Sequence, residues 1–359
     1  MVRSPLRHIV IIQLGSLAQT AVGIHSLRGL TRDFPELKIT VLTQSVHRPL
    51  FAGVDGLEFI YADEECYKGL GGRLRLWWRL QRVGADALAD LTATPLARLL
   101  SFTPTPWRRK RVRISQRRPE GRELTRKYRK VLVQLTPTAT RIRDLFATLG
   151  LPFNMPAPPR RNRTAPLPEA VESVVGGRME KSVGVALLSP NHGTCYPLPL
   201  ACRLIEQLAE LYPRVVVFGR GEYQRQFAEG MQTLHNNVVS VAGRLTLEEE
   251  MALIAHLDVV VTIDGDLLRL ASLVGTPAVS LWGATHPFLE SSGYGQDPKN
   301  AIQHDMPCRP CSSSGKGRCL VGRYACMHSI TPEEVVKRVK TIVRPPRGAD
   351  FTPNANVNS

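Results

Sequence analysis

Short apolar runs and amphipathic stretches alternate along the chain, and this alternation constrains the fold more than any other feature. His8–Leu14 (HIVIIQL) is typical of a buried strand, and apolar residues at helical spacing follow it from Ala18 to Phe34. The same order returns later, where the apolar run Val183–Leu188 precedes a helical pattern over Leu198–Leu211. Repeated strand–helix alternation predicts parallel sheets covered by helices, the α/β class.

A proline-rich segment divides the alternation into two blocks. Leu151–Pro168 holds six prolines among its eighteen residues, and proline both fixes φ and removes a backbone donor. We therefore predict an N-terminal domain over residues 1–160, a C-terminal domain over 161–345 and a flexible tail over 346–359. A length of 359 residues suits two domains of ordinary size.

The loops that follow the predicted strands are the expected ligand sites. In open α/β sheets, ligands bind beyond the carboxyl ends of the strands. The loops at those ends cover residues 15–19, 189–197, 219–222, 264–269 and 282–287.

Positive charge is concentrated in one segment. The chain has 47 Lys and Arg against 31 Asp and Glu, a formal net charge of +16. Twelve of the basic residues lie within Arg108–Lys130, where only Glu120 and Glu123 are acidic. Such a segment attracts nucleic acid, anionic lipid or a polyanionic substrate; a solvated loop or helix face is the alternative. With only Trp107 and Tyr128 as nearby aromatic residues, nucleic acid is the less expected partner.

The apolar residues at the start of the chain form only a short run. Ile9–Ile12 is far shorter than the roughly 20 residues of a membrane span. We therefore expect a cytoplasmic protein.

Four of the seven cysteines lie together near the C-terminus. They are spaced as Cys308-x2-Cys311-x7-Cys319-x6-Cys326. Four thiolates with a leading C-x2-C suit tetrahedral zinc or iron, and these four are the predicted ligands of a structural metal. The later spacings differ from those of a standard zinc ribbon, and reduced thiols or a disulfide are the alternatives.

The C-terminal half resembles a known family. Asp264–Pro287 (DGDLLRLASLVGTPAVSLWGATHP) is similar to the signature of glycosyltransferase family 9, the lipopolysaccharide heptosyltransferases, which is roughly D-[ST]-G-x-x-H-L-A-x3-G-T-P-x3-L-F-G-x-T-x-P. Cys326-Met327 and the following Ile330–Val335 resemble the end of that family, and Gly15–Leu17 resembles its N-terminal S-x-L-G-D loop.

The resemblance implies a GT-B fold, in which two Rossmann-like domains with parallel sheets face each other across a cleft. It also implies an inverting transferase that needs no metal for its chemistry. Such enzymes move a sugar, usually heptose from an ADP-sugar, to the lipid A inner core or a related cell-surface glycan. The expected partners are therefore a nucleotide-sugar donor such as ADP-heptose and an anionic glycolipid or glycan acceptor. Because the family's acceptor lies at the inner face of the inner membrane, the resemblance also implies that the basic segment brings the protein to that surface as a peripheral partner.

Three motif positions differ from the family pattern. Gln19 occupies the position of the family's catalytic Asp, and an amide cannot accept the proton of the acceptor hydroxyl. Thr194 replaces the phosphate-binding Lys, which removes a charge from the phosphate site. In the signature itself, Asp266 stands where the diphosphate normally approaches a glycine, and Arg269 replaces the His. A carboxylate at that position repels phosphate and suits a helix N-terminus.

The remaining roles are assigned by matching position. The resemblance implies that Gly219 and Glu222 hold the nucleoside, although Glu222 is equally an ordinary carboxylate of a first helical turn. The residues expected to meet the diphosphate are Thr194, Arg269 and Thr285, and Asp264 is expected to belong to the same donor-binding site. Gln19 and Asp90 are expected to face the acceptor. Asp90 ends a predicted strand and is the candidate replacement base; its alternative is a carboxylate that caps the next segment.

The motif departures favour one further hypothesis, and the basic segment favours a second. One is a catalytically silent GT-B scaffold that binds a glycolipid or a partner enzyme. The other is a protein glycosyltransferase whose acidic polypeptide substrate is recognised by the basic segment.

Overall fold

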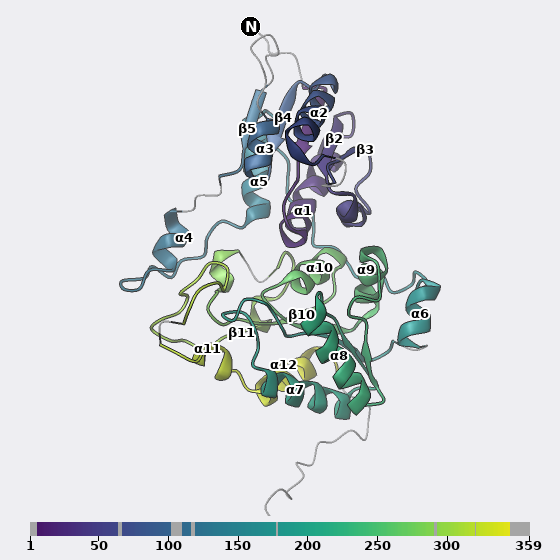
Figure 1. Cartoon of the computed structure of the whole chain (residues 1–359), viewed down its shortest axis with the longest axis vertical. Coiled ribbons are helices and arrows are strands. Elements are labelled where there is room, and N and C mark those ends of the chain that lie inside the picture. The colour runs from purple at the N-terminus through teal and green to yellow at the C-terminus, as the bar shows by residue number, and fades with distance from the viewer. Residues whose placement is uncertain are drawn as a thin grey trace, which may run out of the picture. The chain divides into compact units, whose positions relative to one another are not determined.

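The computed structural model describes residues 6–63, 67–101, 110–115, 119–176, 179–290, 293–319 and 321–344. The chain forms two compact units, one made of residues 1–119 and 136–157 and the other of residues 120–135 and 158–359. Each unit contains its own parallel sheet, as the alternation predicts (Figure 1).

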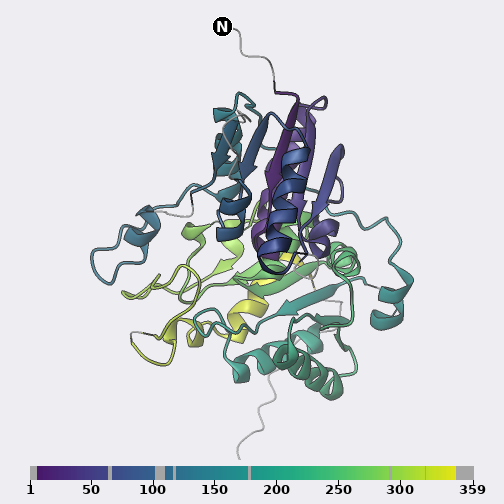
Figure 2. The same ribbon diagram turned by 45° about the horizontal axis from the view of Figure 1, so that its top comes forward.

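The first unit is built on five parallel strands in the order β3-β2-β1-β4-β5. The strands are β1 (His8–Ile12), β2 (Lys38–Thr43), β3 (Leu57–Tyr61), β4 (Ala87–Asp90) and β5 (Lys110–Arg113), and they run side by side in Figure 2. The helices are α1 (Leu17–Asp33), η1 (Ser45–Phe51), α2 (Gly69–Arg82), α3 (Pro95–Leu100) and α5 (Thr138–Thr148). α2 and α3 contact each other and pack with Val10, Ile12 and Leu42 in one core cluster, and α1 contacts α5.

The second unit is built on six parallel strands in the order β11-β10-β9-β6-β7-β8. The strands are β6 (Ser182–Ala186), β7 (Arg214–Val217), β8 (Val238–Ser240), β9 (Val259–Ile263), β10 (Ala278–Leu281) and β11 (Ala301–Ile302). The helices are α4 (Pro119–Leu124), α6 (Glu169–Val175), α7 (Leu198–Leu211), α8 (Glu222–Leu234), α9 (Leu247–His256), α10 (Asp266–Val274), α11 (Ala325–His328) and α12 (Pro332–Ile342), with short η2 (Pro287–Leu289) and η3 (Pro298–Asn300). α7 lies beside α12 (Figure 1), and α9 beside α10.

The central strands of this sheet explain why the alternation is so visible in the sequence. Every residue of β9 (VVVTI) is buried, because helices cover both faces of a parallel sheet. Amphipathic helices complete the core: α7 buries Leu204, Ile205 and Leu208 in the same cluster as the strands. No helix in the described part of the chain is long and apolar enough to cross a membrane.

The segment Glu120–Leu135 belongs to the second unit, whereas the sequence assigned all of residues 1–160 to the first. Lys130 explains the difference, because its Nζ donates to the carbonyl oxygens of Cys308 and Pro310. The Leu135 backbone N–H also donates to Phe288 O at 2.9 Å. Within the predicted basic segment, Arg108, Arg109, Arg117 and Arg118 lie outside the described residues, as does the predicted tail.

Each unit contains a buried histidine that makes stability depend on pH. Burial, together with nearby Arg28, lowers the pKa of His25 to about 3. Burial, together with Arg309, lowers the pKa of His286 to about 4. In the unfolded chain both take up a proton near pH 6.5. Their contribution to stability is therefore fully present above about pH 6.5 and is lost as the pH falls toward 4.

We expect the free energy of unfolding to fall by about 2 kcal/mol per histidine between pH 7.5 and pH 5. Urea titrations at the two pH values measure this loss. His25→Gln should remove this loss from the unfolding of the first unit and His286→Gln from that of the second, whereas His328→Gln, at an exposed position, should leave both unchanged. An equal pH dependence in all four proteins would contradict the assignment.

Candidate functional site

A pocket of about 280 Å³ lies at the carboxyl ends of β6, β7 and β9 in the second unit. We call it the strand-end pocket. Three neighbouring parallel strands end here, so the loops that follow them converge as expected for an α/β ligand site. Its polar lining residues are Ser189, Asn191, Thr194, Arg220, Gln224, Glu250, Thr262, Asp264, Asp266 and Ser314, and Gly219 lines it as well.

Three of the predicted site residues line this pocket: Thr194, Gly219 and Asp264. The Thr194 hydroxyl lies 3.1 Å from both Asn191 O and Ser189 Oγ, which fixes its side chain in the wall. A Cβ at Gly219 would lie 2.6 Å from Gln224 Cβ, so glycine is required for this close packing. The sequence motifs therefore select three residues that lie together at one site.

Three other predicted ligands do not line the pocket. Arg269 is buried, and its Nη2 donates to Asp264 Oδ1 at 3.0 Å, so it neutralises that carboxylate from behind. Thr285 is fully buried and accepts a hydrogen bond from Arg309 at its backbone oxygen. Glu222 is exposed in the first turn of α8, where hydrogen bonds from Arg225 and Gln226 lower its pKa. Glu222 therefore fits the alternative of an ordinary carboxylate in a first helical turn. The buried positions of Arg269 and Thr285 do not fit direct contact with a diphosphate.

Gln19 and Asp90, the residues expected to face the acceptor, have structural partners in the first unit. Gln19 completes a capping box with Ser16 at the start of α1: its Oε1 accepts from Ser16 N at 3.1 Å. Asp90 is completely buried; its Oδ1 accepts from Thr92 N and Ala93 N, and its Oδ2 accepts from Arg113 Nε at 2.7 Å. A base needs a free lone pair within reach of the substrate. The predicted catalytic role of Asp90 does not fit this environment, and its capping alternative does.

The strand-end pocket also contains an ion-pair cluster that the sequence analysis did not predict. Arg220 Nη2 donates to Glu250 Oε2, and its Nε lies 3.8 Å from Asp266 Oδ2. Burial raises the pKa of Glu250, Asp266 raises it further and Arg220 opposes both effects. Arg220 lies in the loop 219–222, which the sequence analysis does predict as a ligand site because it follows a strand. Glu250 is on α9, 30 residues away, and no local pattern connects it with that loop.

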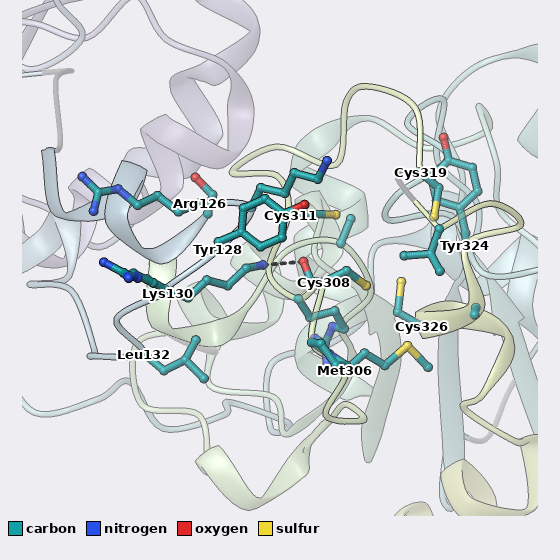
Figure 3. A pocket seen from close by; sticks show the side chains of 18 residues that line it. Arg126, Tyr128, Lys130, Leu132, Met306, Cys308, Cys311, Cys319, Tyr324 and Cys326 are labelled. Carbon is teal, nitrogen blue, oxygen red and sulfur yellow. Dashed lines mark hydrogen bonds between the residues drawn. The ribbon is translucent and has the colours of Figure 1, made fainter.

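The four clustered cysteines line a second pocket, of about 690 Å³ (Figure 3). The segment Thr125–Lys130 forms part of its wall, and the Lys130 side chain points to the Cys308 carbonyl. Burial raises the pKa values of the Cys311 and Cys326 thiols, and neighbouring cysteines add to this effect. We call this the cysteine pocket.

The sequence predicts that the four cysteines of this pocket hold a structural metal. Soft thiolate sulfurs suit zinc or iron chemically. Among the residues that the structure describes, however, no group of three or more His, Cys, Asp or Glu side chains is arranged to hold a metal ion. The cysteines gather as their spacing predicts, but as placed they are free thiols and not a formed coordination shell.

Comparisons with known proteins agree with this architecture. The sequence model of Glycosyltransferase family 9 (heptosyltransferase) matches residues 73–318, more than half of the chain. No curated protein sequence matches. Among solved structures, a family 9 glycosyl transferase from Veillonella parvula is similar with a TM-score of 0.70 and 15% identity, over 94% of this chain and 97% of that one.

Two further solved structures are informative. The ADP-heptose lipopolysaccharide heptosyltransferase II of E. coli has a TM-score of 0.65 and 17% identity, over 93% of this chain and 98% of that one. The iron-containing dodecameric glycosyltransferase TibC of enterotoxigenic E. coli has a TM-score of 0.54 and 12% identity, over 94% of this chain and 76% of that one. At such identities these similarities establish the α/β GT-B fold and nothing finer.

Proposed function

Because the chain belongs to glycosyltransferase family 9, the heptosyltransferases, we propose that it transfers a heptose from ADP-heptose to an anionic cell-surface glycan or lipid A core with inversion. That it is a glycosyltransferase follows from the family. The donor, the acceptor and the stereochemistry are the proposal.

The convergence of motif residues at the strand-end pocket is the observation that supports the donor assignment most directly. Thr194, Gly219 and Asp264, matched to the family by position alone, all line it. Gly265 and Asp266, the N-cap and first residue of α10, line it as well. The N-terminal backbone amides of a helix favour an anion, which suits the diphosphate of a leaving nucleotide. The E. coli heptosyltransferase II bears ADP-heptose in its name, which makes ADP the first donor nucleotide to test.

The acceptor assignment rests on charge. Arg126, Lys127, Arg129 and Lys130 lie in the described part of the basic segment and line the cysteine pocket. Among the residues that the structure describes, the lining of this pocket includes no Asp or Glu. Such an environment attracts a phosphorylated or carboxylated glycolipid, and we propose that it also holds the protein at the cytoplasmic face of the inner membrane.

A thermal-shift titration with ADP, UDP, GDP, CDP and their sugar conjugates tests the proposed donor. A ligand present at about 100 times its Kd adds about 2.7 kcal/mol to the free energy of unfolding. We expect ADP and ADP-heptose to raise Tm selectively. Arg225→Met should not change that response, because Arg225 lies on α8 outside the lining of the strand-end pocket.

A selective response to UDP, GDP or CDP would replace the proposed donor by another nucleotide sugar. The absence of any response at millimolar concentration would contradict donor binding and favour the silent scaffold.

A further inference from the structure

The charge balance of the strand-end pocket is unusual for a site that takes a diphosphate. Three carboxylates line it, those of Glu250, Asp264 and Asp266. Asp264 is neutralised by Arg269, which stands outside the lining. Among the described residues of the lining, Arg220 is the one with a basic side chain. The phosphate groups of a donor therefore have one cation within the pocket to meet.

The position of Arg220 suits it to this task. It lies directly after Gly219, in the loop between β7 and α8, and Gly221 continues the turn with a φ of 104°. The Arg220 side chain is 46% exposed, whereas that of Glu250 is 13% exposed. The carboxylate beneath is therefore fixed and the guanidinium is accessible. Among the described residues, Arg220 Nη1 has no hydrogen-bond partner, so part of the guanidinium fork is open to a ligand.

We propose that Arg220 binds the diphosphate of the donor and supplies the positive charge that Thr194 lacks. This inference rests on the proposed function, because it requires that the strand-end pocket binds a nucleoside diphosphate. Glu250 acts as a positioning residue: it holds the guanidinium by one edge while the other edge meets phosphate. An Arg fork can contact two phosphate oxygens at once, which a threonine hydroxyl cannot do.

The Asp266 carboxylate should weaken donor binding in this arrangement. It is the first residue of α10 and lies within 3.8 Å of Arg220. A diphosphate that reaches the guanidinium approaches this carboxylate and is repelled by it. Removing the Asp266 charge should therefore strengthen diphosphate binding, whereas removing the Arg220 charge should weaken it. The two opposite effects distinguish a phosphate ligand from a residue that only maintains the shape of the pocket.

The test compares ADP with adenosine, because only ADP contains the diphosphate. Isothermal titration of the full-length protein would measure both affinities in wild type, Arg220→Met, Arg220→Lys and Asp266→Asn. We expect Arg220→Met to weaken ADP binding by about 10- to 100-fold and leave adenosine unchanged. Arg220→Lys should restore part of the loss, and Asp266→Asn should strengthen ADP binding several-fold. Arg225→Met is the matched control, since Arg225 pairs with Glu222 and Glu229.

Four outcomes would overturn the inference. If wild type binds no nucleoside diphosphate, the proposed donor site fails and the inference fails with it. If wild type binds ADP and Arg220→Met binds it equally well, the inference alone is wrong. Equal losses of ADP and adenosine affinity would show that Arg220 only supports the pocket. Should Arg220→Met fail to fold, Asp266→Asn decides: unchanged ADP affinity in that variant contradicts the electrostatic account.

Discussion

Asp90→Ala is expected to lower the free energy of unfolding of the first unit by about 3 kcal/mol. The Asp90 carboxylate is buried and accepts hydrogen bonds from two backbone amides and from Arg113. One of those amides belongs to Ala93, whose φ of 50° is unfavourable for a residue with a Cβ. Alanine at position 90 would leave these donors without an acceptor, and the turn at residues 92–93 would lose the hydrogen bonds that hold it.

A second substitution at this position, Asp90→Asn, distinguishes a structural role of Asp90 from a catalytic one. Asp90→Asn keeps an acceptor oxygen for the turn but places an amide beside Arg113, so we expect an intermediate loss of stability. Urea unfolding followed by circular dichroism measures both variants, with Asp144→Asn as control, because Asp144 is an exposed residue of α5. Unchanged stability in Asp90→Asn together with abolished sugar transfer would restore Asp90 as the base and refute the structural account.

Much of the fold follows from the sequence because buried parallel strands leave a strong local signal. The strand predicted at 183–188 is β6 at 182–186, and the helix predicted at 18–34 is α1 at 17–33. Strands covered on both faces must be continuously apolar, and the helices between them must be amphipathic. The predicted α/β class, the GT-B fold and the family are all confirmed.

The placement of Glu120–Leu135 could not be predicted in the same way. This segment has a high positive charge and no apolar period that would direct it to one sheet. Its position depends on Lys130, which binds the backbone oxygens of Cys308 and Pro310. Every residue has a backbone carbonyl, so such an acceptor has no signature in the sequence. Proximity along the chain therefore assigned the segment to the wrong unit.

The site was predictable where a residue lies within two positions of the end of a strand. Gly219 and Asp264 line the strand-end pocket for that reason. Asp90 also ends a strand, but a carboxylate that serves as a base and one that is saturated by hydrogen bonds look identical in a sequence. The pairing of Arg220 with Glu250 depends on the approach of α9 to the loop after β7. Long-range pairs of this kind appear only when the chain is folded.

Arg309→Met is expected to lower the free energy of unfolding of the second unit by about 3–5 kcal/mol. The Arg309 side chain is almost completely buried. Its guanidinium donates to the carbonyl oxygens of Gly283, Thr285 and His304 and to Gln303 Oε1. Methionine fills a similar volume but donates nothing, so several buried acceptors would lose their partner. The midpoint of urea unfolding measures the effect.

The consequence should extend to the cysteine pocket, because Arg309 links the loop after β10 to the segment that contains Cys308 and Cys311. The loop after β10 contains Gly283 and Thr285, and the Ala284 oxygen between them accepts from Cys311 N at 3.0 Å. Loosening that loop should increase the reactivity of the cysteine thiols toward a disulfide reagent, along with the loss of stability. Arg318→Met is the control, because Arg318 lies in the same segment but is exposed. Equal stability and equal thiol reactivity in both variants would show that the loop is held by other contacts.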